Sequence, residues 1–397
     1  MFIVGIDVAK RSHEAIIIDS SGHIVKKAFN FMNDSIGFSK LLNTLNSVSN
    51  DPTEFVIGME STAHYWVVLY SNLCKAGFTV RVLNPIQSNA LRGLYIRQVK
   101  NDERDSFIIA EVIRFGRYTE GGMPPSRLYE LRELCRARFF LVDMTADLKR
   151  KVIALLDQVF PEYESIFTDI FGLTSSELLR NYSMPEEIAA IDTEKLTRLL
   201  EEPSRKRFRS TKAKQIQNVA ANSFGIVMGF DTLGLLIKQY MEHIRYDESL
   251  LTLIDTKIEE LFSVYNTYLT TIPGIGPTLG ATIFSEIGDI SKFQSAAKLA
   301  AFAGIDPTIK QSGAFTATRN HMSKRGSPYL RRALWQASTI AVMHDPNLKA
   351  FFQKKRMEGK AYMCAIGHVT KKLTNIVYAV LRDNKTYYSP IPVTEEI

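Results

Sequence analysis

Residues 2–31 read FIVGIDVAKRSHEAIIIDSSGHIVKKAFNF and contain three apolar runs separated by short polar segments. The runs IVGID, HEAIIID and HIVKKAFNF have the length and β-branched content of strands, and Ser20-Ser21-Gly22 predicts a turn. We therefore expect a three-stranded meander. Asp7 ends the first run, and because burying an ionised carboxylate is costly, we expect it at a strand edge facing water, a positive substrate group or a divalent metal ion. Taken alone, a capping role for Asp7 would be the simpler interpretation.

A second carboxylate follows another apolar run, EFVIGMEST at residues 54–62, which ends at Glu60. Helical spacing at 35–48 and 64–78, and a further strand-like run at 79–84, alternate with these strands and predict an α/β sheet. If the strands of Asp7 and Glu60 are parallel neighbours, both carboxylates lie at the edge where open α/β sheets bind ligands.

Two more carboxylates, Asp102 and Asp105, stand at the start of the helical pattern in QVKNDERDSFIIAEVI. Their spacing of three predicts one helix face, although acidic residues at a helix start are also explained by the helix dipole. Together with the two strand-end carboxylates, they provide the hard oxygen ligands that two Mg²⁺ ions need, with Mn²⁺ as a possible substitute.

Composition limits the remaining possibilities. The chain has 397 residues, is 45% hydrophobic, and carries 49 Lys and Arg against 42 Asp and Glu, a net charge of +7. This length suits two or three domains, and the basic excess suits a polyanionic partner. The 3 cysteines have no disulfide or zinc spacing. No run reaches transmembrane length and no signal peptide pattern is present, so we expect a soluble, cytoplasmic protein that does not contact membranes.

The Gly- and Pro-rich segment at 121–126 predicts a boundary after a first domain at 1–123. Two long apolar-periodic runs, at about 128–160 and 233–268, predict long helices in a coiled-coil region at 124–268. They could pair antiparallel, pair with another subunit, or form part of an ordinary bundle. A helical insertion at 161–229 contains PSRKRFRSTKAK, where Arg205, Lys206, Arg207 and Arg209 are predicted to contact nucleic acid. A solvated charged loop is the simpler alternative.

The last predicted domain, 269–388, begins with a Pro-Gly-Ile-Gly-Pro turn that resembles a helix-hairpin-helix motif. Gly274 and Gly276 would let backbone amides approach a phosphate, although a plain helix connection would use the same residues. Farther on, Ser312 precedes a glycine and a basic stretch, and such a serine could attack a phosphodiester whose charge is stabilised by cations. On residue type alone, a turn is the simpler interpretation. The basic residues of this stretch are Arg319, Lys324, Arg325, Arg331 and Arg332.

The motifs GIDVAK, GMEST and KNDERD, followed in order by PGIGP, AAKLAAFAGIDP, QSG and MSKRGSPYLRRAL, resemble those of the DEDD transposases of bacterial insertion sequences. This family includes bridge-RNA-guided recombinases and relatives of the Piv and MooV invertases. One departure is Asn101, where the family's third motif usually has Thr.

The resemblance implies an α/β plus all-α architecture. Its parts would be an N-terminal ribonuclease H-like (RuvC-like) domain, a coiled-coil region and a helical C-terminal transposase domain. It also implies that Asp7, Glu60, Asp102 and Asp105 bind the metal and that Ser312 is the nucleophile. The implied activity is DNA cleavage and exchange through a serine-linked intermediate, by a homo-oligomer associated with the nucleoid and guided by a structured RNA.

Three alternatives remain open at this point. A RuvC-like nuclease would use the same carboxylates to activate water, and cleavage by a Ser312→Ala variant would favour it. A sugar-kinase-like ATPase also begins with a Gly-Ile-Asp strand, and ATP turnover without DNA would favour that. A non-catalytic RNA-binding adaptor would keep its function in an Asp7→Asn variant.

Overall fold

We describe the protein from a computed structural model, and the structure describes residues 1–92, 102–116, 118, 121–226, 228–308, 311–312, 315–316 and 321–389. The chain divides into two compact units, Met1–Pro125 and Ser126–Ile397, and each has its own hydrophobic cores. None of the helices in these described ranges combines the length and apolar composition needed to cross a membrane.

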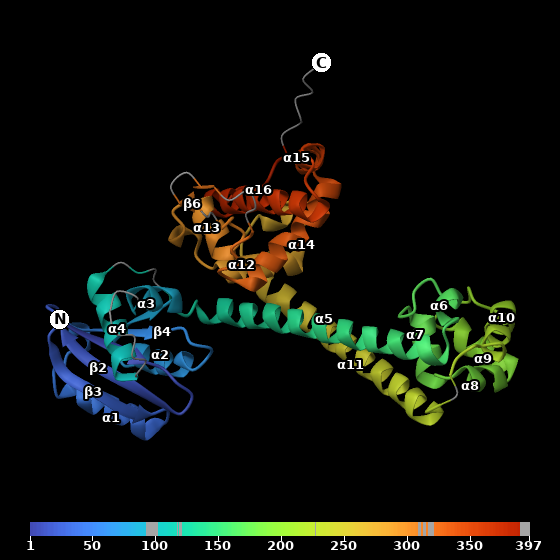
Figure 1. Ribbon diagram of the computed structural model, residues 1–397, viewed down its shortest axis with the longest axis horizontal. Helices are drawn as coiled ribbons and strands as arrows, with labels where there is room; N and C mark the ends of the chain where they lie inside the picture. The colour runs from blue at the N-terminus through green and yellow to red at the C-terminus, as the bar shows by residue number, and fades with distance from the viewer. Residues whose placement is uncertain are drawn as a thin grey trace, which may run out of the picture. The chain divides into compact units, whose positions relative to one another are not determined.

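The first unit is built on a mixed β-sheet (Figure 1). Its strands are β1 (Phe2–Asp7), β2 (Ser12–Asp19), β3 (Ile24–Met32), β4 (Phe55–Glu60) and β5 (Thr79–Leu83). They lie in the order β3-β2-β1-β4-β5. The pairs β1–β2 and β2–β3 are antiparallel, whereas β1–β4 and β4–β5 are parallel. The predicted meander and the predicted α/β sheet are therefore confirmed, and the turn uses Gly22 in a left-handed conformation with φ of 94°.

Helices cover both faces of this sheet because the strands alternate apolar residues to the two sides. The helical elements are α1 (Ser35–Asn46), η1 (Pro52–Glu54), α2 (Trp66–Lys75), α3 (Pro85–Arg92) and α4 (Asp102–Phe115). On one face, Leu41 of α1 and Leu69 of α2 share a core with Ile6. On the other, Ile109 of α4 shares a core with Ile3. Ile6 and Ile3 of β1 therefore lie on opposite faces of the sheet.

Two long helices, α5 (Ser126–Val159) and α11 (Phe230–Ser263), belong to the second unit. Arg138 binds Asp255, and Lys149 binds Glu248. Residue numbers rise along α5 while their partners' numbers fall along α11, so the two helices are antiparallel. The predicted antiparallel pairing of the two long helices within one chain is therefore confirmed (Figure 1).

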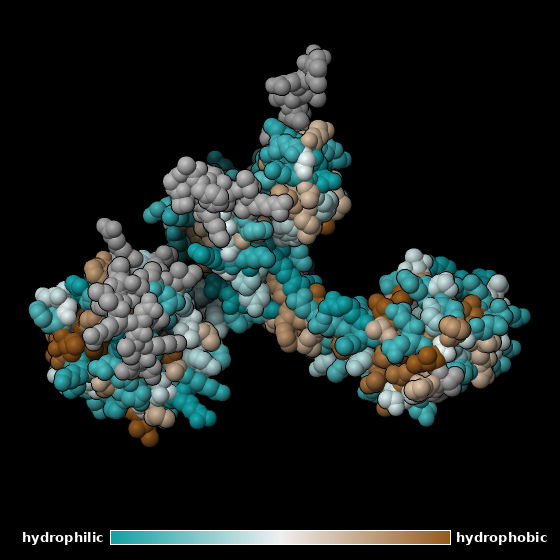
Figure 2. Space-filling view, in the orientation of Figure 1, coloured by the Kyte–Doolittle hydropathy of each residue, from teal (hydrophilic) through white to brown (hydrophobic). Residues whose placement is uncertain are grey.

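The insertion between these long helices packs around a core that it shares with the C-terminal end of α5 and the N-terminal part of α11. Its helices are α6 (Tyr163–Ile166), α7 (Leu173–Asn181), α8 (Pro185–Ala190), α9 (Thr193–Glu201) and α10 (Ser210–Ala221). Tyr163 and Phe160 are fully buried within it. Figure 2 shows hydrophobic surface on this part of the molecule, where Leu173, Phe224 and Met228 are exposed by 77%, 88% and 84%.

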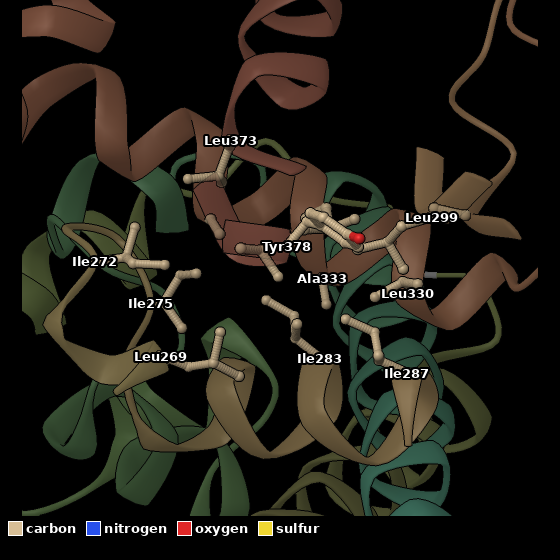
Figure 3. Packing of buried hydrophobic residues seen from close by; sticks show 14 of the residues in the cluster. Leu269, Ile272, Ile275, Ile283, Ile287, Leu299, Leu330, Ala333, Leu373 and Tyr378 are labelled. Carbon is tan, nitrogen blue, oxygen red and sulfur yellow. The ribbon is translucent and has the colours of Figure 1, made fainter. Parts of the chain in front are cut away.

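The C-terminal part of the second unit is mostly helical around the core drawn in Figure 3. Its elements are η2 (Leu269–Thr271), α12 (Pro277–Ile287), η3 (Ile290–Lys292), α13 (Ala296–Ala303), β6 (Gln311–Ser312), β7 (Phe315–Thr316), α14 (Pro328–His344), α15 (Pro346–Met357) and α16 (Tyr362–Asp383). Ile283 of α12, Leu330 of α14 and Leu373 of α16 meet in this core. The element before the Pro-Gly-Ile-Gly-Pro turn is the short η2 turn and not a long helix, so the resemblance to a helix-hairpin-helix extends only to α12.

Candidate functional site

Asp7 and Glu60 lie side by side at one edge of the sheet. Ile6 pairs with Met59 in the parallel β1–β4 ladder, so the next residues of the two strands, Asp7 and Glu60, are neighbours. Adjacent strands lie about 4.8 Å apart. The two strand-end carboxylates predicted to share an edge therefore do so, and both are half-buried.

Both carboxylates face helix α4. Side chains two residues apart in a strand point to the same side, and a Cβ on Gly5 would lie 2.0 Å from the Ser106 carbonyl oxygen of α4. Likewise, a Cβ on Gly58 would lie 3.2 Å from Ile109 of α4. Asp7 and Glu60 follow these glycines by two residues, so they share the α4 face.

Asp105 lies in the helix α4 that covers this face of the sheet. It precedes Ser106, whose carbonyl packs over Gly5, and its side chain is only 7% exposed. Asp105 and Asp7 both take part in polar or electrostatic interactions. Asp102 is the first residue of α4, and its spacing of three from Asp105 puts it on the same helix face; its side chain lies outside the described part of the structure.

The donors at this edge suit a divalent cation. Carboxylate oxygens are the ligands that Mg²⁺ and Mn²⁺ prefer, and the missing Cβ of Gly5 lets the backbone of α4 pack closely on β1. Among the described side chains, however, no three His, Cys, Asp or Glu groups are gathered closely enough to hold an ion. The chemistry of the residues fits the implied metal, and the fourth carboxylate of the predicted set, Asp102, is not among those described side chains.

Sequence reasoning missed Glu14, a further carboxylate at this edge. Glu14 of β2 pairs directly with Asp7 across the antiparallel β1–β2 ladder, and directly paired residues share a face. Three neighbouring strands therefore present Glu14, Asp7 and Glu60 in a row. Glu14 could have been predicted from the meander, because a short connection between two antiparallel strands sets which residues pair.

His13 holds the loop that follows Asp7. Its ring is 1% exposed, and Nδ1 accepts a hydrogen bond of 3.3 Å from the Ala9 amide. Asn33 donates through its backbone amide to the Arg11 carbonyl, and through its side chain to the Lys10 carbonyl. Burial lowers the pKa of His13, so the neutral ring that can accept from Ala9 is favoured.

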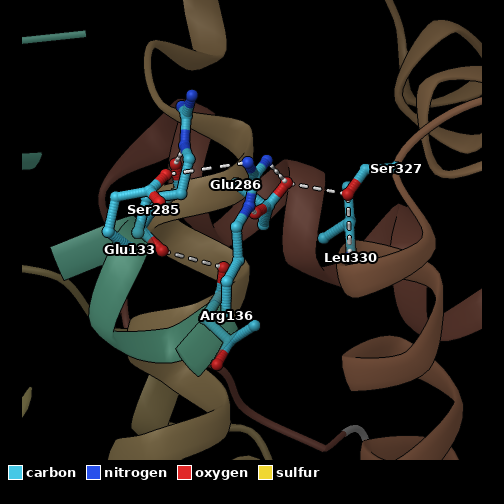
Figure 4. Close-up of polar contacts among 8 residues, drawn as sticks. Glu133, Arg136, Ser285, Glu286, Ser327 and Leu330 are labelled. Carbon is cyan, nitrogen blue, oxygen red and sulfur yellow. Dashed lines mark hydrogen bonds and ion pairs between the residues drawn. The ribbon is translucent and has the colours of Figure 1, made fainter. Parts of the chain in front are cut away.

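The predicted nucleophile lies in the second unit. Ser312 pairs with Phe315 in the short β6–β7 hairpin, and its side chain is outside the described residues. Two nearby serines are already engaged. Ser323 donates to the Asp306 carboxylate at 2.5 Å, and Ser327 donates to Glu286 at 2.7 Å. Figure 4 shows Ser327 within the network that Glu286 forms with Arg136.

The predicted basic residues of the insertion lie in the loop between α9 and α10. Arg205 and Lys206 have positive φ angles of 52° and 63°, and Arg205, Lys206, Arg207 and Arg209 are exposed. Phe208 packs against Phe167 in the insertion core. The loop therefore offers cations for phosphate contact, while its aromatic ring is used in packing.

The predicted basic residues of the C-terminal part differ in their surroundings. Arg332 makes two hydrogen bonds to Asp143 of α5, at 2.7 and 2.8 Å, and these bonds lower the pKa of Asp143. Arg331 donates to the Ala303 carbonyl. Lys324 and Arg325 are exposed, and neither has an ion pair with a carboxylate in the described ranges. Arg319 lies outside those ranges.

The two predicted phosphate-binding glycines also differ. A Cβ on Gly274 would lie 2.4 Å from the Ala337 carbonyl of α14, so this glycine permits close packing of the turn. Gly276 is exposed at the N-terminus of α12, with open space around its Cβ position. Only Gly276 therefore has a backbone that is open to a ligand without displacing a helix.

Comparisons with known proteins cover both units. A transposase family model of the DEDD type matches residues 4–161, and a model for the transposase IS116/IS110/IS902 family matches residues 266–353. The 44.8 kDa protein of insertion element IS116 from Streptomyces clavuligerus is 25% identical over 397 residues, 99% of this chain and 97% of its own length.

The pilin gene-inverting protein of Moraxella bovis is 24% identical over 393 residues, 97% of each chain. The transposase for insertion sequence element IS1111A of Coxiella burnetii is 29% identical over 119 residues, 29% of this chain and 32% of its own. The acidic motifs fall within the first matched segment, and Ser312 falls within the second. The chain belongs to the DEDD transposases of the IS110/IS116/IS902 insertion-sequence family.

Proposed function

We propose that this protein is a transposase or recombinase that cleaves and rejoins DNA strands through a covalent link to Ser312, assisted by Mg²⁺ at the acidic edge. The observation that carries this proposal is the in-register placement of Asp7 beside Glu60 beneath α4. Carboxylates repel one another at this spacing, and a divalent cation offsets that repulsion. The family assignment supports the same conclusion.

The fold and domain proposals follow from the same arrangement. The sheet order β3-β2-β1-β4-β5 supports a ribonuclease H-like, RuvC-like domain at 1–123. The core shared by the insertion and the long helices supports a coiled-coil region with its insertion at 124–268, and the core built mainly from α12 to α16 supports a C-terminal transposase domain at 269–388. We also propose that the active protein is a cytoplasmic homo-oligomer.

The proposed chemistry is a reversible transesterification. The Ser312 hydroxyl oxygen attacks the phosphorus of a phosphodiester, the bond to one deoxyribose oxygen breaks, and that oxygen takes up a proton as the serine loses its own. Attack by the hydroxyl of another strand releases Ser312 and restores a phosphodiester. Asp7, Glu60, Asp102 and Asp105 would hold Mg²⁺, which supplies charge stabilisation to the phosphoryl oxygens when bound.

A nicked DNA substrate that traps the covalent intermediate tests this function. We expect a DNA adduct on Ser312 by peptide mass spectrometry, and no adduct in Ser312→Ala or Asp7→Asn. An adduct on Ser323 or Ser327 would contradict the assignment, as would strand transfer by Ser312→Ala.

A water-using nuclease remains the second candidate, because the acidic edge and Ser312 belong to different compact units. In that case the Ser312→Ala variant would cleave DNA without forming an adduct. Neither the wild type nor this variant would join strands. The same substrate therefore separates the two candidates.

The guide RNA is a further proposal, and it rests on the family resemblance. A structured RNA that pairs with donor and target DNA would bring sequence specificity that the protein's exposed cations do not supply. Sequencing the nucleic acid that co-purifies with the protein tests it. A single recurrent structured RNA is the expected result, and random cellular RNA would contradict it.

A further inference from the structure

A cavity of about 800 Å³ opens beside the N-terminal end of α14. Its apolar and aromatic lining includes Met322, Pro328 and Trp335, and its polar lining includes His321, Lys324 and Arg331. Such a volume is within the usual range for small-molecule and cofactor sites. A flat ring system that carries a negative charge would match this combination of an indole and cations.

The cationic side of the cavity is held in a fixed conformation. Lys324 has a φ of 53°, a left-handed conformation that costs energy in any residue except glycine. Its amide donates to the Gly304 carbonyl, and the amides of Ser323 and Ser327 donate to Asp306 and Phe302. Strained residues held in this way occur preferentially at ligand sites, and a rigid frame lowers the entropic cost of binding.

The cavity also adjoins the segment that carries Ser312. The Thr308 amide donates to the His321 carbonyl at 2.8 Å, and Pro307 pairs with Met322. Ser312 follows Thr308 by four residues, so their Cα atoms are at most about 14 Å apart. A nucleotide in this cavity would therefore lie within a few nucleotides of the phosphodiester that reacts with Ser312.

We propose that this cavity binds an unpaired nucleotide of the DNA strand that Ser312 cleaves, with the base stacked on Trp335 and its phosphate beside Lys324. This inference rests on the proposed function for its choice of DNA. A base held out of the duplex would fix the position of the neighbouring phosphodiester. Trp335 is thereby a positioning residue for cleavage.

Fluorescence of Trp335 provides a direct test. The chain has 2 tryptophans, so a Trp66→Phe background leaves Trp335 as the sole indole. The full-length protein is titrated with short oligothymidylate, an abasic strand of equal length, oligouridylate, and a DNA duplex. We expect saturable quenching by oligothymidylate, little change with the abasic strand or the duplex, and a weaker response to RNA.

Substitutions separate stacking from charge. Trp335→Ala should weaken oligothymidylate binding about tenfold while leaving abasic binding unchanged, and Trp335→Phe should restore most of the affinity. Lys324→Ala should reduce the slope of log affinity against log salt by about one. Lys349→Ala removes an exposed lysine of α15 and should leave that slope unchanged. Thermal unfolding by circular dichroism checks that each variant is folded.

Equal quenching by the abasic strand, a preference for RNA, or unchanged affinity in a folded Trp335→Ala variant would overturn the inference. The adduct assay on Ser312 is independent of these measurements. An adduct without Trp335 quenching would leave the proposed function standing and remove the cavity's role. Base-dependent quenching without an adduct would support the cavity's role and contradict the proposed function.

Discussion

At the scale of single residues, the acidic edge depends on carboxylates that strand pairing places together. Asp7 adjoins Glu60 on one side and Glu14 on the other. Like charges at this spacing raise the free energy of the folded chain until a cation offsets them. Activity and stability should therefore respond in opposite directions when one charge is removed.

We expect Asp7→Asn to lower strand cleavage about a hundredfold or more and to leave the unfolding temperature equal or slightly higher. Parallel cleavage assays and thermal melts measure both effects. Glu54→Gln, at the opposite end of β4, removes an exposed carboxylate and should change neither. A marked fall in the melting temperature of Asp7→Asn would show that Asp7 has a mainly structural role.

His13 gives the first unit a pH response. Burial lowers its pKa below the usual value of 6.5, so between the lowered pKa and 6.5 the unfolded chain binds more protons than the folded chain. The free energy of unfolding should therefore fall as the pH decreases through this window. Urea unfolding of the wild type, from about pH 7.5 to 5, measures the slope.

His13→Asn should flatten that profile, because its amide oxygen can accept from Ala9 without titrating. His23→Asn is the matched control, since His23 is exposed near the other end of β2. Identical slopes in the wild type and His13→Asn would contradict the assignment.

At the scale of elements, close packing of α4 on β1 depends on Gly5. A Cβ there would lie 2.0 Å from the Ser106 carbonyl and 2.6 Å from the Ala110 amide. These are backbone atoms, so the helix itself must move. Gly5→Ala should destabilise the unit by about 3 kcal/mol and displace Asp105 from the edge, with loss of cleavage.

Gly58→Ala is the matched control, because its Cβ would meet the Ile113 side chain at 2.6 Å and a side chain can partly adjust. Chemical denaturation measures how far each variant lowers the free energy of unfolding. A Gly5→Ala protein as stable as the wild type would contradict the packing argument.

The loop between α9 and α10 is the second element with a testable role. Alanine at Arg205, Lys206, Arg207 and Arg209 should weaken nucleic-acid binding and reduce its salt dependence, because fewer counterions are released. Binding isotherms at several salt concentrations measure this slope. An unchanged slope of log affinity against log salt concentration would show that these residues do not contact nucleic acid.

At the scale of the whole molecule, the long helices leave apolar side chains exposed. Phe140 of α5 and Leu253 of α11 are exposed by 64% and 65%. Exposed apolar surface of this kind is a typical site of association, and strand exchange joins at least two duplexes. We expect a dimer or larger assembly.

Light scattering on the protein with its nucleic acid tests this assembly. Serine at both Phe140 and Leu253 should reduce the measured mass, whereas Leu173→Ser on the insertion should not. A strict monomer in the wild type would contradict the prediction. If assembly is required for Ser312 to meet the acidic edge, the double variant should also lose the DNA adduct.

The sequence by itself determined the strands of the first unit, the two long helices and the strand-end carboxylates. The short apolar runs that end at Asp7 and Glu60 predicted their strands, and the long apolar repeats predicted α5 and α11, because these signals depend only on neighbours along the chain. Charge clusters such as Arg205 to Arg209 were equally visible. The family motifs added the roles of Asp102, Asp105 and Ser312 as expectations.

Only the tertiary structure decided which distant residues meet. Strand register placed Glu14 opposite Asp7, and helix packing brought Arg332 to Asp143. The segment that follows Ser312 and the N-terminal part of α14 together formed the cavity around Trp335. Such contacts depend on how elements pack and not on local preference. An arginine in a basic run therefore looks the same in sequence whether it is held by a carboxylate of another helix or open to a phosphate.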